Sequence, residues 1–365
     1  MTPADPPAPD PDANLDLRAD IPGARAGPIA FAFDFPDLLN EFMALDGEAR
    51  RLRSWSRRLG VVSILLVFLA LATASADPLI AAFGENVHHN LRYFAAAAGM
   101  VGTLLGLLGL PRSSFRNRWV GHRFRAELLR HFHFHYLAAR VPSLVAAAGD
   151  PALEAAYGEH RASALATLKS RYLDLSGAEL TPLIEAPERV SLEEITPIET
   201  TEPERSEPAA LLFAAWRKLR LDWQQSYSAS KLDSVRIGLR TPRQQGRILS
   251  TLSWACIAAV MILHATHFGE PWLHLTAAQG AFAQLLIVWI ALLALAIRAL
   301  EDGLAPQREV ERYEQYRIRI ETMAESFDRA RTDSVRLAIM RAFELTSRDE
   351  MNLFIRTHSH SRFLL

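Results

Sequence analysis

Histidine is the residue type whose spacing best fits chemistry in this chain. His131, His133 and His135 alternate with phenylalanines, and on a helix His131 and His135 would share one face with Glu127, one turn earlier. Two histidines on one helical face can ligate a metal ion. The neighbouring sequence lacks the further ligands that a metal site needs, so the spacing favours a packed helix face. We therefore predict neither a metal nor a cofactor.

No catalytic signature accompanies these histidines. The sequence has no glycine-rich phosphate loop, no Gly-x-Gly-x-x-Gly, no His-Glu-x-x-His and no Gly-x-Ser-x-Gly. A single cysteine, Cys256, rules out an intrachain disulfide and a cysteine-built zinc site. The net charge of −1 argues against nucleic-acid binding, which needs an excess of positive charge. We predict a protein that is not an enzyme.

Four long gaps in the distribution of charged residues indicate the class of protein. No Asp, Glu, Lys or Arg occurs in residues 59–76, 93–111, 248–269 and 271–297. A helix of about 18 to 20 residues matches the roughly 30 Å hydrocarbon layer of a membrane. Buried helices of soluble proteins usually carry a polar stripe, which these gaps lack. The sequence therefore predicts an all-α integral membrane protein with four transmembrane helices, arranged as two hairpins.

Arginines are concentrated at one end of every gap. They precede the first and third gaps and follow the second and fourth, whereas the two short loops between paired gaps hold one arginine in total, Arg92. The positive-inside rule then places both termini and residues 112–247 in the cytoplasm. The arginines at the gap ends are Arg50, Arg51, Arg53, Arg57, Arg58, Arg112, Arg116, Arg118, Arg123, Arg125, Arg236, Arg240, Arg243, Arg247, Arg298, Arg308 and Arg312.

The second predicted span is rich in small residues. Its glycines recur every three or four residues, and Gly102 and Gly106 form a GxxxG pair, which lets two helices approach closely within the bundle or between protomers. Gln284 and Thr103 are the notable polar groups at depth, too few to favour a carrier with an ion site. The candidates for helix packing or for a pore are Gly99, Gly102, Gly106, Gly109 and Gln284.

A second group of histidines lies near the two short loops. These residues could sense pH if the loops meet, because histidine titrates near neutrality. Their position at headgroup depth favours the alternative, in which they are simply tolerated at the membrane interface. The group consists of His88, His89, His264, His267 and His274.

Outside the hairpins the sequence predicts cytosolic helices and two unstructured segments. The first 30 residues hold seven prolines and five aspartates, and residues 176–208 hold nine glutamates and five prolines, so both are expected to be disordered. The predicted segments are a tail (1–30), a basic amphipathic lead helix (31–58), hairpin 1 (59–111), cytosolic helices (112–175), an acidic disordered linker (176–208), an amphipathic helix (209–247), hairpin 2 (248–297) and coiled-coil-like helices with a tail (298–365).

Two aromatic-rich stripes occur in the predicted cytosolic helices. One follows a 3-4-3-4-3 spacing from Tyr313 to Ala330, and the other a 3-4-4 spacing from Trp216 to Tyr227. Fewer than three heptads are present, which favours packing of the stripes on each other inside one protomer over oligomerisation. The candidates for interaction are Trp216, Trp223, Tyr227, Tyr313, Tyr316, Ile320 and Phe327.

Two short motifs stand next to the predicted hairpins. Arg118-Trp119 and Arg123-Phe-Arg-Ala-Glu-Leu-Leu-Arg130 follow the first hairpin, and Asp222-Trp-Gln-Gln-Ser-Tyr227 precedes the third span. This pattern resembles the SLATT-like families, in particular the four-span SMODS- and SLOG-associating type. Those families are bacterial membrane domains associated with nucleotide-sensing modules in anti-phage defence.

The resemblance implies an inner-membrane effector that permeabilises or depolarises the membrane in an anti-phage or stress response. Residues 1–40 are too short for a fused sensor domain, so the signal would come from a separate cytosolic sensor of a nucleotide or bind the helices directly. We expect a homo-oligomer in the bacterial inner membrane, with the lipid bilayer as partner and no nucleic acid. The alternative function is a membrane-anchored scaffold or signalling adaptor that docks cytosolic partners through its amphipathic helices.

Overall fold

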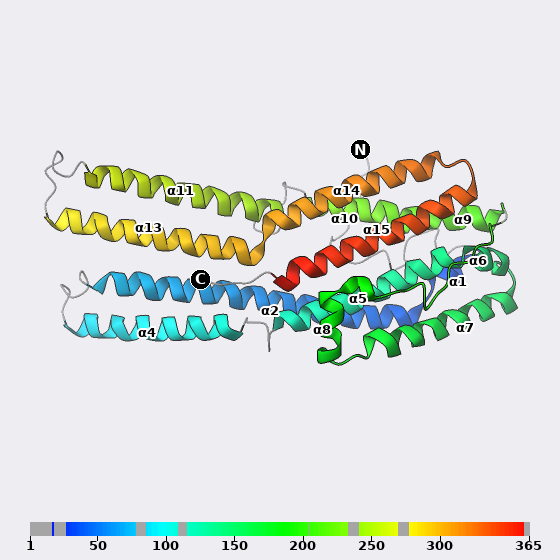
Figure 1. The fold of residues 1–365 in the computed structure, drawn as a ribbon, viewed down its shortest axis with the longest axis horizontal. Coiled ribbons are helices and arrows are strands. Elements are labelled where there is room, and N and C mark those ends of the chain that lie inside the picture. The colour runs from blue at the N-terminus through cyan, green and yellow to red at the C-terminus, as the bar shows by residue number, and fades with distance from the viewer. Residues whose placement is uncertain are drawn as a thin grey trace, which may run out of the picture. The chain divides into compact units, whose positions relative to one another are not determined.

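In the computed structural model every regular element of the described residues is a helix (Figure 1). The described residues are Leu17, 27–77, 85–108, 115–203, 205–232, 241–268 and 277–360. Three helical stretches are long and apolar enough to cross a membrane, and they lie within Ala30–Ser75, Pro242–Ala265 and Phe282–Arg329. The second predicted span falls in a further helix that ends at the edge of the described residues and is not among these three.

Contacts divide the chain into two compact units. Unit 1 holds residues 1–49, 120–233 and 310–359, and unit 2 holds residues 50–119, 234–309 and 360–365. Helix α2 (Pro36–Ser75) is uninterrupted, so its first residues belong to unit 1 and the remainder to unit 2. The predicted lead helix and the predicted first span are therefore one continuous helix.

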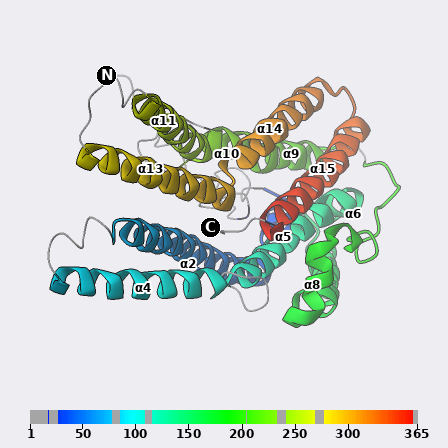
Figure 2. The same ribbon diagram turned by 60° about the vertical axis from the view of Figure 1, so that its left-hand side comes forward.

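Unit 2 contains two helical hairpins. One pairs the later part of α2 with α4 (Glu85–Leu108), and the other pairs α11 (Pro242–Phe268) with α13 (Ala277–Leu304) (Figures 1 and 2). A small apolar cluster joins the hairpins, in which Ile64 of α2 packs with Ala296 and Ala299 of α13.

A tryptophan also ties the two hairpins together. The indole Nε1 of Trp289 donates to the carbonyl oxygen of Ala72 at 3.1 Å and to the hydroxyl of Ser75 at 3.0 Å. Both acceptors lie in the last turn of α2, where the Ala72 carbonyl oxygen also accepts from the backbone N–H of Ala76 and from the Ser75 hydroxyl. The indole bonds therefore add a link between α13 and the end of α2.

Unit 1 is built around α5, with short helices joined by tight turns. Several of its helices begin at a capping residue that the sequence supplies: Asp150 accepts from the backbone N–H groups of Ala152 and Leu153, and Ser176 with Glu179 forms a capping box. The elements are α1 (Ala30–Phe33), α5 (Phe115–Ala139), α6 (Val141–Ala147), α7 (Pro151–Leu168), α8 (Gly177–Glu185), α9 (Glu207–Trp216), α10 (Trp223–Leu232), α14 (Pro306–Arg329) and α15 (Asp333–His360).

Two π-helical turns interrupt otherwise regular helices in unit 1. The first, Lys169–Leu173, continues α7, and the second, Arg217–Asp222, joins α9 to α10. A π-helical turn holds an extra residue and is found frequently at functional sites. The second of these turns carries Arg220, whose side chain is fully buried.

The structure differs from the expectation of a disordered linker over residues 176–208. Helix α8 and a 3₁₀ turn at Pro187–Arg189 occupy its first part, and the following irregular segment buries Val190, Leu192 and Thr196. The composition of the segment predicts disorder because a composition takes no account of the partners that the segment meets elsewhere in the chain. Here the glutamates meet arginines of neighbouring helices, which offsets the cost of ordering the chain.

The other predicted unstructured segment lies largely outside the described residues. Within the predicted tail, only Leu17 and residues 27–30 are described, and both Leu17 and Ile29 are buried. Towards the C-terminus, the predicted coiled-coil-like segment forms α14 and α15, which together make a helical hairpin (Figure 2).

Candidate functional site

The candidate functional site is the polar core of unit 1, centred on α5. Every residue of α5 from Leu128 to Ala139 is buried. A helix that is buried on all sides is normally apolar throughout, yet this one carries Arg130 and three histidines. Such groups are costly in a core unless neighbouring groups compensate them.

A chain of ion pairs compensates the first part of α5. Arg123 pairs with Asp46 of α2 and with Glu127 one turn later, and Arg130 donates to both oxygens of Glu127 at 3.0 and 2.9 Å. Burial acts to raise the pKa of the Glu127 carboxyl, but Arg123 and Arg130 outweigh it and lower the pKa to about 2. Glu127 is therefore ionised at any physiological pH. The guanidinium of Arg130 also lies over the ring of Phe42, 5.0 Å from its centre.

A second, fully buried ion pair lies farther along the core. Arg220 donates from Nε and Nη2 to the two carboxylate oxygens of Glu344, at 3.0 and 2.9 Å, and from Nη2 to the hydroxyl of Ser347 at 2.8 Å. Its guanidinium lies 4.3 Å from the ring centre of Phe134 on α5. This bidentate geometry is the strongest form of arginine–carboxylate pairing.

Three of the histidines of α5, namely His131, His133 and His135, lie in the same core, and burial disfavours their charged form. Burial lowers the pKa of both His131 and His133 to about 3, with Arg220 adding to the effect on each, and burial also lowers the pKa of His135. Nε2 of His135 is 3.2 Å from the carbonyl oxygen of Thr196. Among the described residues no group of three or more His, Cys, Asp or Glu is placed to hold a metal ion.

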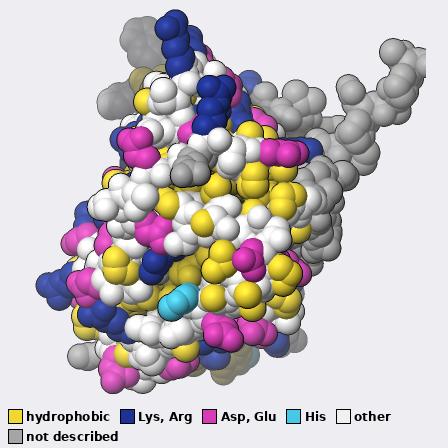
Figure 3. Space-filling model, turned by 90° about the vertical axis from the view of Figure 1, so that its right-hand side faces the viewer, with side chains coloured by type: hydrophobic (Ala, Val, Ile, Leu, Met, Phe, Trp, Pro, Cys, Tyr) yellow, Lys and Arg dark blue, Asp and Glu magenta, His cyan; other side chains and the backbone are white. Residues whose placement is uncertain are grey.

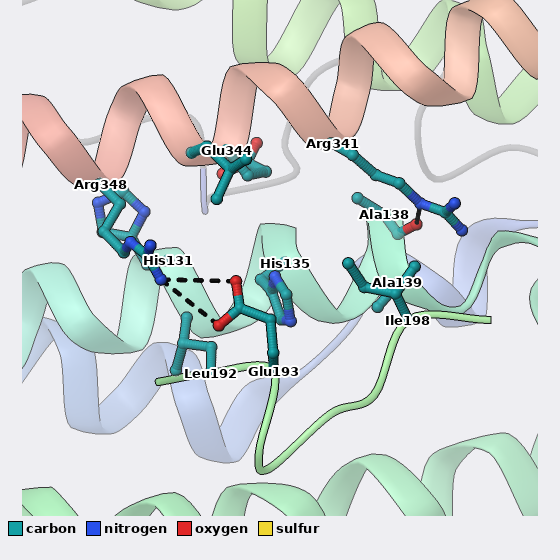
Figure 4. Close-up of a pocket in the computed structure, with 11 residues that line it drawn as sticks. His131, His135, Ala138, Ala139, Leu192, Glu193, Ile198, Arg341, Glu344 and Arg348 are labelled. Carbon is teal, nitrogen blue, oxygen red and sulfur yellow. Dashed lines mark hydrogen bonds and ion pairs between the residues drawn. The ribbon is translucent and has the colours of Figure 1, made fainter. Parts of the chain in front are cut away.

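A small cavity lies between α5, α15 and the segment that follows α8 (Figure 4). Its volume is about 90 Å³, which is room for only about three waters and well below the roughly 300 Å³ that small-molecule sites need. Glu193 reaches across it to pair with Arg348, at 3.4 Å. The residues around it include His131, His135, Leu192, Glu193, Ile198, Arg341, Glu344 and Arg348.

The structure brings the two aromatic stripes together inside unit 1. Trp216 packs on Phe327 with ring centres 5.4 Å apart, and Tyr227 packs on Tyr313 at 6.1 Å. Of the two alternatives for these stripes, packing on each other inside one protomer describes the buried members, whose surface is used within unit 1. The buried members are Trp216, Tyr313, Tyr316, Ile320 and Phe327, while Trp223 and Tyr227 are half-buried.

The glycines of α4 face α2 within hairpin 1. A Cβ atom on Gly102 would lie 2.9 Å from Cγ2 of Val67 and 3.0 Å from the Val67 backbone N, and one on Gly99 would lie 3.3 Å from Cβ of Ala70. The hydroxyl of Ser63 donates to the carbonyl oxygen of Gly102 at 2.7 Å. The sequence left open whether these glycines pack within the bundle or between protomers. Gly99, Gly102 and Gly106 pack within the bundle, against α2.

The remaining sequence candidates are not brought together. Gln284 is exposed on α13, and Gly109 lies outside the described residues. Among the histidines near the short loops, His89 packs edge-on against Tyr93 and His264 is exposed. The side chains of His88, His267 and His274 lie outside the described part of the chain.

Sequence reasoning missed Asp46, Arg220 and Glu344, although the signal for two of them is present. Asp46 follows Leu38 and Phe42 at helical spacing, and Arg220 follows Trp216 in the same way. An ionisable residue at a position where the apolar stripe continues indicates a buried ion pair.

Comparisons of the chain with protein-family models, with curated proteins and with solved structures give no match.

Proposed function

We propose that the chain is a four-span protein of the bacterial inner membrane, an effector that permeabilises or depolarises the membrane after a cytosolic signal. In this proposal both termini and unit 1 are cytoplasmic, the active form is a homo-oligomer, and a separate cytosolic sensor of a nucleotide supplies the signal. The observation that supports it most is that one continuous helix, α2, carries both the buried, charged Asp46 and an apolar span.

Helix α2 supports the proposal because it carries both parts without a break. Asp46 in unit 1 pairs with Arg123, and Ile64 in unit 2 packs in the small cluster that joins the hairpins. A change in the ion pairs of unit 1 that shifts α2 along or about its axis would displace the packed residues of the span. Packed helices respond to such shifts by moving between discrete arrangements.

The packing of unit 2 favours a gated effector over a permanently open channel. Its spans contain no Asp, Glu, Lys or Arg, and the glycines of α4 bring α2 and α4 into close contact. A path for ions would therefore need the helices to separate or several copies to assemble.

The test measures membrane potential by dye fluorescence in cells that carry the native operon, with and without this gene, during phage challenge. We expect depolarisation only on infection and only when the gene is present. The double substitution Gly102→Leu with Gly106→Leu should abolish it at equal expression, while Thr103→Leu, on the exposed side of the same helix, should not.

Two results would contradict the proposal. A double variant that still depolarises infected cells would remove the close-packed hairpin from the mechanism. An unchanged potential in an operon that still needs the gene for protection would favour the membrane-anchored scaffold, which would then have to dock partners through surfaces other than the buried aromatic stripes.

A further inference from the structure

The segment from Ala186 to Glu199, which we call the acidic strap, lies on unit 1 as a largely irregular chain with a 3₁₀ turn at Pro187–Arg189 and a turn after Leu192. Four of its glutamates each meet a different arginine, two of which lie on α15 and two elsewhere in unit 1. The pairs are Glu188 with Arg356 at 2.6 Å, Glu193 with Arg348 at 3.4 Å, Glu194 with Arg171 at 2.6 Å and Glu199 with Arg140 at 2.8 Å.

Backbone and apolar contacts complete the attachment of the acidic strap. The backbone N–H of Glu199 donates to the carbonyl oxygen of Ala139 at 3.0 Å, and Arg341 donates to the carbonyl oxygen of Glu199 at 2.8 Å. Val190 and Leu192 are buried beneath the chain. The surface under the strap therefore contacts its carboxylates, the backbone of Glu199 and its aliphatic side chains.

Two of the four ion pairs that hold the acidic strap are weak. In the pairs of Glu188 and Glu194 both side chains are about half exposed, and exposed pairs contribute little because water and salt screen them. The strap also lacks the regular backbone hydrogen bonds of a helix along most of its length. Segments of this kind open at lower free energy than the core they cover.

Opening the acidic strap would uncover a surface with five arginines, next to the carboxylate of Glu344, which is paired with Arg220. Arg140, Arg171, Arg341, Arg348 and Arg356 would all lose their strap partners. On the face drawn in Figure 3, basic and acidic side chains are interspersed with hydrophobic ones. The cavity under the strap is too small for a nucleotide-sized ligand, so an occupant would have to lie along the surface.

We propose that this arginine surface is a docking site for an acidic segment of a partner protein, and that the acidic strap is its built-in competitor. The strap itself shows the chemistry that the site takes: Glu188, the adjacent pair Glu193 and Glu194, and Glu199, at intervals of five residues, with aliphatic residues between them. Because the strap is tethered, its effective concentration is of the order of millimolar, so it masks the surface from weak partners. The proposal rests on unit 1 alone and does not depend on membrane permeabilisation.

The test uses the full chain in detergent and a fluorescent peptide that copies residues 186–201. A release variant replaces four strap glutamates with glutamine, at Glu188, Glu193, Glu194 and Glu199. Hydrogen exchange should rise in residues 186–199 of this variant only, and the peptide should bind it at least tenfold more tightly than the wild-type chain. Adding Arg341→Gln and Arg348→Gln should abolish the binding, while Glu159→Gln, an exposed acid on α7, should change neither readout.

Each other outcome overturns the proposal. Unchanged hydrogen exchange in the release variant would show that the ion pairs do not hold the strap. Faster exchange without peptide binding would show that the uncovered arginines are not a docking site. A single-stranded oligonucleotide of the same charge that binds as tightly as the peptide would show a general polyanion surface instead of a protein-docking one.

Discussion

The two units of this chain pack their helices with opposite kinds of side chain. Unit 1 buries charged groups and compensates them with partners, as in the pair of Arg220 and Glu344, whose side chains are 0% and 4% exposed. Unit 2 brings helices together through small residues and leaves large apolar side chains such as Trp254 and Met261 exposed. The difference follows from the surroundings that each unit suits, because apolar exposure is favourable in lipid and costly in water.

The largest effect should come from breaking the buried pair in unit 1. The change Arg220→Met leaves the Glu344 carboxylate buried without its main partner, and we expect a loss of about 3–5 kcal/mol in the free energy of unfolding. Urea titration of the purified protein, followed by tryptophan fluorescence, measures this loss.

The double variant Arg220→Met with Glu344→Met is the matched control. Replacing both charges with apolar groups should restore much of the lost stability, since neither variant side chain needs a polar partner. An Arg220→Met loss below about 1 kcal/mol would show that water reaches the carboxylate and that the core of unit 1 is not closed.

The next effect should come from filling the close contact in unit 2. Gly102→Leu places a side chain where a single Cβ already lies 2.9 Å from Val67, and overpacking of this kind costs about 1–3 kcal/mol. The separation of α2 from α4 can be followed by a disulfide between Ala70→Cys and Gly99→Cys, in a chain that also carries Cys256→Ala.

The crosslink should form readily in the parent chain, because the two Cβ positions are 3.3 Å apart. Gly102→Leu should lower its yield severalfold, and Thr103→Leu should leave it unchanged. Equal yields in all three chains would show that the hairpin accommodates a side chain at position 102 without separating α2 from α4.

A smaller effect should come from lowering the pH, which is expected to destabilise unit 1 through its buried histidines. The pKa of His133 is lowered from 6.5 to about 3 in the folded chain, so its contribution to stability is complete above pH 6.5 and is lost as the pH falls from 6.5 toward 3. Linkage gives about 1.4 kcal/mol for each pH unit in that window. Glu127, whose folded pKa is about 2, loses its contribution only below its ordinary value of 4.5.

Thermal unfolding between pH 8 and pH 5 therefore isolates the histidines. The substitution His133→Phe suits a site where Nδ1 has no hydrogen-bond partner among the described residues, and it should reduce the pH slope by the contribution of one histidine. A slope equal to that of the parent chain would mean that His133 is already hydrated in the folded chain.

The smallest effect should come from the backbone at the junction of α13 and α14. Ala305 has a φ of +46°, and this left-handed conformation costs a residue with a Cβ about 1–2 kcal/mol. Ala305→Gly should therefore be neutral or stabilise by less than about 1 kcal/mol, since glycine also loses more entropy on folding. Ala155→Gly, at an exposed position inside α7, should instead cost about 1 kcal/mol, and the two midpoints of thermal unfolding distinguish these signs.

The sequence predicts the helices better than it predicts their polar partners. The charge gaps match α2, α11 and α13, and the spacing of Gly99, Gly102 and Gly106 indicates the close-packed face of α4. These signals are local, because each comes from residues within a single helix. The periodicity of apolar residues indicates which face of a helix is buried, and it indicated the buried faces that carry the two aromatic stripes.

The buried ion pairs and the acidic strap depend on contacts that no local pattern contains. Arg220 and Glu344 are 124 residues apart in the chain, and the strap becomes ordered only because arginines from several elements surround it. The glutamate and proline content predicted disorder over residues 176–208. The free energy that orders the segment comes from partners elsewhere in the sequence.

The π-helical turn at Arg217–Asp222 has a consequence for the evolution of such chains. Its extra residue rotates everything before it by about 100° relative to everything after it, compared with a regular α-helix. Deleting one residue there would move Arg220 away from Glu344, or Trp223 and Tyr227 away from the face they share with Trp216. A homologue with a one-residue gap at this place is therefore expected to have lost the buried Arg220–Glu344 pair as well, so insertion and ion pair would be inherited together.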